Sequence, residues 1–467
     1  MEKAELAALE QYYRSIFGDI RRDIARLVEI ESVLGEASEN APHGPAPEKA
    51  RVRGMEIMEE LGFEAHDCDR MIAYAEAGNR DKFIGIIGHL DIVPIGDGWI
   101  TDPLTVTEKD GYLVGRGVLD DKGPLIMAAY AAKHVLETKN CKYGIRMIMG
   151  LDEETGMTDV EHYCRTQKIP LASFTPDASF PVCYGEKGRV SMRLHSEPVS
   201  GGNVLDFGYG AAENAVPDKA FAVIADKHRE TIEKAVRNQW ISVEDDPKGV
   251  RVLAKGIPAH AAMPENGHSA GRELAMFLLS LGILDPAETG AMQYIVKLTD
   301  SYHGEQFRID SSDDIFGPLS IVSGMAGMEG GRIWVDFDSR IPGSIAPDEV
   351  IRNISDRAMR YGMKDPRVFD RTQSFHIDPE GPLVKLLSEA YSEVTGEDGK
   401  PFAMAGGTYS KHLPNCVSFG PEKPKPDYAE WVGGCHERNE GMLIDDMIKA
   451  CMIYDIAISR LMEAELE

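Results

Sequence analysis

The central stretch of this sequence is residues 82–94, Lys-Phe-Ile-Gly-Ile-Ile-Gly-His-Leu-Asp-Ile-Val-Pro, which is almost wholly apolar and ends in two polar side chains. A run this apolar is typical of a strand buried on both faces of a parallel sheet. His89 and Asp91 are two residues apart, so they point to the same side of that strand and can touch. A carboxylate beside an imidazole fixes its tautomer and raises its basicity, which favours metal binding. The pair indicates a metal ligand with a supporting carboxylate, although a structural histidine held by its neighbour has the same pattern.

Three other predicted elements are flanked by carboxylates. These are Asp120 and Asp121 before an alanine-rich helix, Glu153 and Glu154 after an apolar strand, and Asp177 after a short apolar run. Pro124 opens the helix, and capping of its first turn would by itself account for the two aspartates before it. In an open parallel sheet, however, the carboxyl ends of the strands meet at one edge, where ligands bind. One imidazole with several carboxylates at such an edge suits two divalent ions of the zinc, cobalt or manganese kind better than magnesium.

Length and charge limit the classes of protein to which the chain can belong. With 467 residues, of which 43% are hydrophobic, we expect two or three compact domains. Acidic residues exceed basic ones by 27, which argues against nucleic acid or an anionic membrane as a partner. The first residues lack the pattern of a signal peptide and no apolar run approaches membrane-spanning length, so we expect a cytoplasmic protein. Seven scattered cysteines without a Cys-x-x-Cys motif indicate reduced thiols rather than disulfides or a thiolate zinc site.

Taken together, these motifs resemble those of the di-zinc aminoacylase/carboxypeptidase family of metallopeptidases, and most closely its peptidase V branch of bacterial Xaa-His dipeptidases. The matching motifs are Gly88-His89-Leu90-Asp91-Ile92-Val93-Pro94, Gly115-Arg116-Gly117 with Asp120-Asp121-Lys122-Gly123, and Asp152-Glu153-Glu154. The resemblance implies an α/β fold, with a phosphorylase/hydrolase-like zinc-peptidase catalytic domain formed by residues 1–184 and 375–467. Residues 185–374 would form an inserted α+β lid domain, doubled and ferredoxin-like.

The resemblance also implies a set of metal ligands. The five implied ligands are His89 and Asp177 on one ion, Glu154 and His436 on the other, and Asp120 bridging both. The implied cofactor is two zinc ions, which cobalt or manganese could replace. The family pattern further has a cis peptide bond after the bridging aspartate, here between Asp120 and Asp121.

Four residues match family positions that contact substrate: Asn214, His260, Arg340 and Gly406. The resemblance implies that His260 polarises the scissile carbonyl and that Arg340 grips a C-terminal carboxylate in a bidentate manner. Gly406 belongs to a Gly-Gly-Thr-Tyr loop whose backbone would lie against the substrate. Without the resemblance, a histidine between alanines, a turn asparagine and an ion-paired arginine would all be interpreted as structural. A lid of this length matches the doubled kind, which favours a monomer.

The expected function is that of a metal-dependent dipeptidase that acts on small peptides with a free C-terminal carboxylate. Glu153 is expected to take the proton of the attacking water, and Asp91 to support His89. The first alternative is a deacylase of N-acetyl or N-succinyl amino acids that uses the same site. The second is a non-catalytic metal-binding or peptide-binding protein, which the presence of Glu153 beside every implied ligand argues against.

Overall fold

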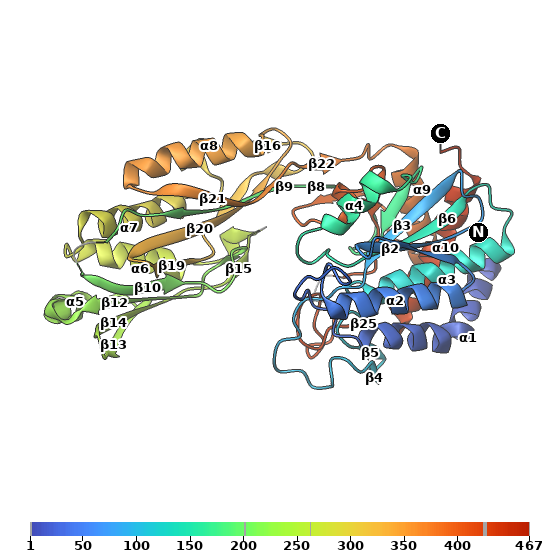
Figure 1. The fold of residues 1–467 in the computed structure, drawn as a ribbon, viewed down its shortest axis with the longest axis horizontal. Coiled ribbons are helices and arrows are strands. Elements are labelled where there is room, and N and C mark those ends of the chain that lie inside the picture. The colour runs from blue at the N-terminus through green and yellow to red at the C-terminus, as the bar shows by residue number, and fades with distance from the viewer. Residues whose placement is uncertain (1, 200–201, 262, 424–426, 467) are drawn as a thin grey trace. The chain divides into compact units, whose positions relative to one another are not determined.

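The structure is a computed structural model that describes residues 2–199, 202–261, 263–423 and 427–466. The chain forms two compact units, whose elements are labelled in Figure 1. Unit 1 comprises Met1–Gly185, His376–Ala403 and Gly407–Glu467. Unit 2 comprises Glu186–Phe375 together with Met404–Gly406. The middle of the chain is therefore inserted between two segments that fold together.

Unit 1 is built on a mixed β-sheet. Its strands are β1 (Glu64–Cys68), β2 (Ile72–Ala77), β3 (Phe83–His89), β6 (Gly144–Gly150), β7 (Ser173–Thr175), β8 (Cys183–Glu186), β22 (Phe375–His376), β23 (Phe402–Met404) and β24 (Cys416–Ser418). Their order is β1-β2-β6-β3-β7-β24-β8-β22, with β23 beside β8. The central strands β6, β3, β7 and β24 are parallel, whereas β1 and β2 are antiparallel. A small separate sheet has the order β25-β5-β4, formed by Gly441–Leu443, Tyr112–Val114 and Thr107–Lys109.

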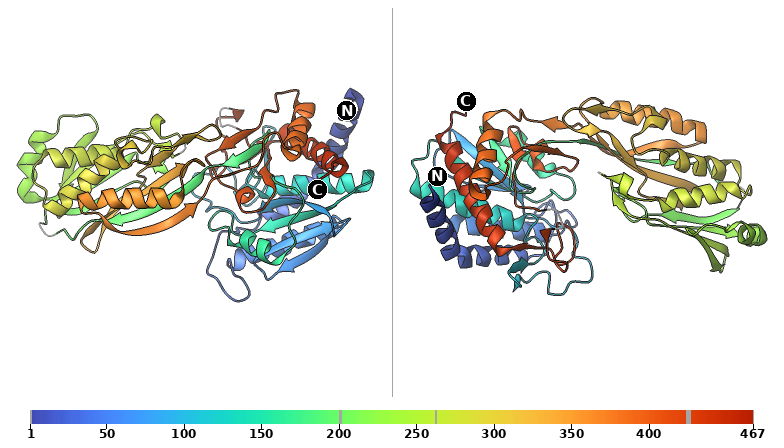
Figure 2. Two further views of the ribbon diagram at one scale, coloured as in Figure 1. Left: turned by 90° about the horizontal axis from the view of Figure 1, so that it is seen from above. Right: turned by 180° about the vertical axis from the view of Figure 1, so that it is seen from behind.

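Helices cover both faces of this sheet. They are α1 (Lys3–Val28), α2 (Pro45–Glu60), α3 (Lys122–Thr138), α4 (Thr158–Thr166), α9 (Pro382–Thr395) and α10 (Ile444–Glu463). In unit 1, α10 lies beside α1, α3 and α9, as Figure 2 shows from behind. α3 begins at Lys122, two residues before the expected start at Pro124, which a proline in the first helical turn permits.

The central apolar stretch forms β3, and every residue of this strand is buried. Ile84 and Ile86 belong to the large core that includes side chains of α1, α3 and α10. Ile87 belongs to a smaller core on the other face, with Val160 and Tyr163 of α4. Burial on both faces explains why the sequence of β3 is continuously apolar instead of alternating.

Unit 2 is built on an antiparallel sheet with helices packed against it. Its strands are β9 (Gly188–His195), β10 (Val204–Tyr209), β12 (Lys219–Ala225), β13 (Ile241–Asp246), β14 (Gly249–Lys255), β18 (Ser320–Val322), β19 (Ala326–Glu329), β20 (Arg332–Ile341) and β21 (Lys364–Thr372). The order is β13-β14-β12-β10-β19-β20-β9-β21, with β18 paired to β20. Its helices are α5 (Arg229–Ala235), α6 (Ala270–Ser280), α7 (Pro286–Leu298) and α8 (Pro347–Ala358). Two short strand pairs, β11 (Ala215–Val216) with β15 (Ala259–His260) and β16 (Ser312–Asp313) with β17 (Gly317–Pro318), complete the unit.

Unit 2 has its own hydrophobic core. Side chains of the sheet, such as Val190 and Phe337, are fully buried against helical side chains such as Leu274 and Ile354. This core is separate from those of unit 1. Among the described residues of the whole chain, none of the helices combines the length and the apolar character needed to cross a bilayer.

Candidate metal centre

The candidate ligands of unit 1 follow three neighbouring parallel strands. His89 ends β3, Glu154 follows β6, and Asp177 follows β7. β3 pairs with both of the other strands, and His89 lies in register with Gly150 at the end of β6. Because the strands are parallel, their carboxyl ends lie at the same edge of the sheet. The topology thus brings together residues that are far apart in the sequence.

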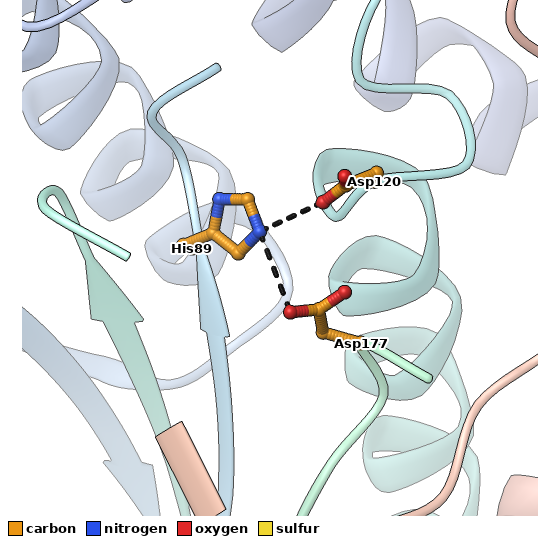
Figure 3. Close-up of side chains that lie close together, drawn as sticks. All are labelled: His89, Asp120 and Asp177. Atoms are coloured by element: carbon orange, nitrogen blue, oxygen red, sulfur yellow. Dashed lines mark hydrogen bonds and ion pairs between the residues drawn. The ribbon is translucent and has the colours of Figure 1, made fainter. Parts of the chain in front are cut away.

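The first ligand group, here called the His89 group, consists of His89, Asp120 and Asp177. Nε2 of His89 lies 2.9 Å from Oδ1 of Asp120 and 3.7 Å from Oδ2 of Asp177, and Figure 3 shows the ring pointing toward both carboxylates. The three ligand atoms lie within 4.8 Å of one another. The His89 side chain is fully buried. One metal ion could contact all three side chains from a single position.

The second ligand group, here called the His436 group, consists of Asp120, Glu154 and His436. Nε2 of His436 lies 3.0 Å from Oδ2 of Asp120 and 3.0 Å from Oε2 of Glu154. Asp120 therefore directs one oxygen toward each imidazole. A carboxylate in this position can bridge two ions. The peptide bond between Asp120 and Asp121 is cis, as the family pattern predicts.

The electrostatics of both groups favour a bound cation. Burial by itself lowers the pKa of His89, but hydrogen bonds with Asp120 and Asp91 raise this pKa well above its ordinary value. Hydrogen bonds with Asp120 and Glu154 raise the pKa of His436 to about 11. In each group the neighbouring carboxylates favour positive charge at the imidazole, and a divalent ion would supply positive charge to the same carboxylates. The donor set of imidazole nitrogens and carboxylate oxygens fits zinc, cobalt or manganese.

Asp91 links the two strand ends that carry the ligands. Nδ1 of His89 lies 3.0 Å from the backbone carbonyl oxygen of Asp91 and 3.4 Å from its carboxylate Oδ1. The other carboxylate oxygen, Oδ2, accepts a hydrogen bond from the backbone N–H of Glu154 at 3.1 Å. The nearer of the two Asp91 groups to Nδ1 of His89 is therefore the backbone carbonyl. The Asp91 carboxylate, expected to support the imidazole, also accepts a hydrogen bond from the loop after β6.

Glu153 lies next to a candidate ligand but belongs to neither ligand group among the described residues. Burial raises the pKa of Glu153 well above its ordinary value, and the charge of Asp177 raises this pKa further. A carboxyl group with a raised pKa can accept and return a proton near neutral pH. Its catalytic role stays a prediction.

Sequence reasoning missed two residues that support the site. Oδ2 of Asp159, in α4, accepts hydrogen bonds from the backbone N–H groups of Leu151 and Asp152 and from the hydroxyl of Tyr409. The ring of Tyr409 packs edge-on against His89, with the ring centroids 6.4 Å apart. The local signal is Gly150, where a Cβ atom would lie 1.9 Å from the Tyr409 hydroxyl oxygen. Only the folded chain shows why that position needs glycine.

The four expected substrate-binding residues all lie in unit 2. The carbonyl oxygen of Asn214 accepts a hydrogen bond from the N–H of Ala261, the residue after His260. Burial lowers the pKa of His260, and the charge of Arg340 lowers it further. Arg340 donates from Nε to Asp338 at 2.8 Å and from Nη1 to the carbonyl oxygen of Ala405 at 3.1 Å. Asn214, His260 and Arg340 therefore belong to one polar region of unit 2, and Gly406 follows the residue that contacts Arg340.

The chain is similar to proteins of known family. The model of the peptidase family M20/M25/M40 matches residues 85–460. "Putative dipeptidase YtjP" of Bacillus subtilis is 31% identical over 466 residues, which cover 95% of this chain and 97% of that protein. "Putative dipeptidase SH1171" of Staphylococcus haemolyticus is 32% identical, over 94% of this chain and 96% of that protein.

Two solved structures share the fold of the chain. The di-peptidase Dug1p of Saccharomyces cerevisiae has a TM-score of 0.60 at 13% identity, and the alignment covers 98% of this chain and 99% of that one. Human carnosine dipeptidase 1 has a TM-score of 0.59 at 13% identity, covering 98% and 100%. These likenesses confirm the predicted α/β fold class. Since the family model spans most of the sequence and the relatives align over nearly their whole length, the chain belongs to the peptidase family M20/M25/M40.

Proposed function

We propose that the protein is a metal-dependent dipeptidase that hydrolyses the amide bond of dipeptides with a free C-terminal carboxylate. The observation that carries this proposal is the position of Asp120, whose two carboxylate oxygens lie 2.9 Å and 3.0 Å from the two imidazoles. Membership of the peptidase family supports the same activity, as do the names of the two relatives, both of which are called putative dipeptidases. We also propose that the chain belongs to the peptidase V branch of the family, as expected from its sequence motifs.

The proposed cofactor is two zinc ions, which cobalt or manganese could replace. His89 and Asp177 would hold one ion, Glu154 and His436 the other, and Asp120 both. When bound, such ions supply Lewis acidity that polarises the scissile carbonyl and makes a water molecule easier to deprotonate.

Two side chains outside the ligand groups would assist the reaction. We assign Glu153 as the group that takes the proton from the attacking water and passes it to the leaving amine, which its raised pKa supports. Asp91 would keep His89 and the loop of Glu154 in place through the contacts described above.

The polar region of unit 2 is proposed to bind the substrate. The planar guanidinium of Arg340 suits a carboxylate, and its contact with buried Asp338 fixes the orientation of that fork. His260, whose lowered pKa favours the neutral imidazole, would donate a hydrogen bond to the developing oxyanion. Asn214 and the backbone of Gly406 would complete the contacts.

A dipeptide panel on chelated protein, after zinc, cobalt or manganese is added back, tests this function. We expect metal-dependent hydrolysis of dipeptides, including those ending in histidine, and loss of hydrolysis when the C-terminal carboxylate is amidated. The Glu153→Ala variant should lose turnover by about 10²–10⁴-fold, the usual contribution of a general base, while it keeps its metal content. Loss of metal from this variant would show that the roles of Glu153 and Glu154 are exchanged.

The same panel separates the alternatives. Hydrolysis of N-acetyl or N-succinyl amino acids, without hydrolysis of dipeptides, would replace the proposal with a deacylase. Metal binding without turnover of either class would replace it with a binding protein.

We also propose a cytoplasmic monomer. All seven cysteines are free, which fits a reducing compartment, and the lid length resembles the doubled kind of the peptidase V branch. Sedimentation analysis tests the oligomeric state, and a dimer at micromolar concentration would refute the proposed monomer.

A further inference from the structure

A buried ion pair lies behind the His436 group. Nη1 of Arg116 lies 2.6 Å from Oε2 of Glu440, and the two side chains are 2% and 0% exposed. Neither residue belongs to a ligand group or to the proposed substrate contacts. A charged pair so deeply buried is costly to desolvate, and replacing it by apolar residues is often neutral or stabilising. Its presence so close to the ligands therefore calls for a role other than stability.

The carboxylate of Glu440 also binds the segment that carries Asp120. Its other oxygen, Oε1, accepts hydrogen bonds from three backbone N–H groups, those of Gly117 and Leu119 at 2.9 Å and of Asp120 itself at 3.1 Å. The backbone carbonyl oxygen of Glu440 accepts a fourth, from the N–H of Gly115 at 3.0 Å. One residue thus holds the backbone from 115 to 120, ending at the shared ligand.

Arg116 extends the same contact to the loop that carries His436. Nη2 of Arg116 donates to the backbone carbonyl oxygens of His436 at 3.4 Å and of Ile95 at 3.3 Å. The loop needs such support, because the His436 side chain is 56% exposed and its backbone has a φ of 63°, in the left-handed region that non-glycine residues rarely adopt. Directly after Glu440 the chain joins β25, which pairs with β5. The ion pair is therefore connected to the loop that carries Asp120 and to the loop that carries His436.

We propose that Glu440, through its buried pair with Arg116, is a positioning residue that sets the spacing between Asp120 and His436 and thereby the affinity of the His436 group for its metal ion. The inference rests on the proposed metal centre and adds a residue that the ligand set does not contain. Glu440 acts on the backbone of Asp120 and, through Arg116, on the backbone of His436. Among the described residues, Glu440 forms no hydrogen bond or ion pair with His89 or Asp177, which belong to the His89 group alone, so the two metal affinities should respond differently.

The test is a zinc titration of chelated protein in competition with a chromogenic chelator, on wild type and the Glu440→Gln variant. We expect two equivalents bound by wild type. In Glu440→Gln the equivalent of the His436 group should lose about 10–100-fold in affinity, the usual loss when an outer partner of a ligand is removed, and the other should change less. The His436→Ala variant, titrated in parallel, identifies which equivalent belongs to the His436 group. Excess zinc should restore turnover in Glu440→Gln, which a global packing defect would not allow.

The matched control is the Glu76→Gln variant. Glu76 on β2 forms a similarly buried pair with Arg146 on β6, with 2.6 Å between Oε2 and Nη2. Arg146 lies near the start of β6, whereas Glu154 follows the end of that strand. Its zinc affinities should equal those of wild type. Unchanged affinities in Glu440→Gln, or equal losses in both variants, would overturn the inference.

A second variant, Arg116→Lys, tests the same inference if Glu440→Gln does not fold. Arg116→Lys keeps the positive charge but loses the planar fork that reaches the carbonyl oxygen of His436. It should weaken binding of the same zinc equivalent, and an unchanged titration would overturn the inference.

Wild-type protein that binds two zinc ions without hydrolysing dipeptides would refute the proposed function and leave the positioning role of Glu440 intact. Wild-type protein that binds no zinc would refute the proposed metal centre itself.

Discussion

The two imidazoles of the candidate metal centre lie at nearly the same distance from Asp120, 2.9 Å for His89 and 3.0 Å for His436, but in very different surroundings. His89 ends a fully buried strand that pairs on both sides, and its side chain is 0% exposed. His436 lies in a loop, with a left-handed backbone and a side chain that is 56% exposed.

The difference shows that one site uses two kinds of support. The sheet positions His89, because β3 cannot move without breaking its hydrogen bonds to β6 and β7. In the described part of the chain, the loop around His436 is not a strand of the main sheet, and the polar contacts that hold it include those of Arg116 and Glu440. We therefore expect substitutions near His89 to affect stability and metal binding together, and substitutions near His436 to affect mainly metal binding.

The largest expected effect comes from removing each imidazole in turn. In metal-free protein, His89→Ala leaves buried carboxylates without their cation and should cost about 3–5 kcal/mol in the free energy of unfolding. His436→Ala removes a largely exposed partner and should cost about 1 kcal/mol or less. Urea unfolding of chelated protein measures both values, and equal losses would contradict the comparison.

A smaller effect is expected from adding a methyl group near each imidazole, at Gly150 close to His89 and at Gly434 in the loop of His436. In Gly150→Ala the new Cβ would lie 1.9 Å from the Tyr409 hydroxyl oxygen, so overpacking should destabilise unit 1 by about 1–3 kcal/mol. In Gly434→Ala the new Cβ would have no described atom within 4 Å, and the change should stay within about 0.5 kcal/mol. Thermal unfolding compares the two, and a tolerated Gly150→Ala would show that β6 and Tyr409 can separate.

The carboxylate of Asp91 contacts both His89 and the loop that carries Glu154. Asp91→Ala should lower metal affinity by about 10–100-fold, or ~1.4–2.7 kcal/mol, because it frees both His89 and the loop of Glu154. Asp97→Ala, at an exposed position a few residues further along, serves as the control. Zinc competition measures the affinities, and identical values for the two variants would show that the backbone carbonyl of Asp91 suffices.

The smallest expected effect is a difference in hydrogen exchange. Adding zinc to chelated protein should slow amide exchange in residues 433–440, because the ion would tie the loop to Asp120 and Glu154. Amides of β3 should change little, since the sheet already protects them. Mass spectrometry of peptic fragments resolves the two regions, and equal slowing in both would argue against a loop that needs the metal.

Much of the fold and of the candidate ligand set was predictable from local patterns. The apolar stretch before His89 indicated a doubly buried strand, and acidic residues after the next strands indicated a shared edge. His436 and the residues of unit 2 were reachable only through the family resemblance, because no periodicity marks them. The roles of Asp159 and Glu440 were not predictable, because their partners are backbone N–H groups that any sequence carries.

Local sequence was sufficient to predict which chemical groups the candidate site contains. The continuous apolar runs indicated the strands, and an imidazole and several carboxylates follow the ends of those runs. The resemblance implied that Asp120 is shared, and the folded chain directs one of its oxygens to each imidazole. Only the folded chain showed that Glu440, hundreds of residues away, holds the backbone of Asp120. The physical reason is that side-chain periodicity is a local property, whereas a hydrogen bond between distant segments exists only once the sheet has brought them together.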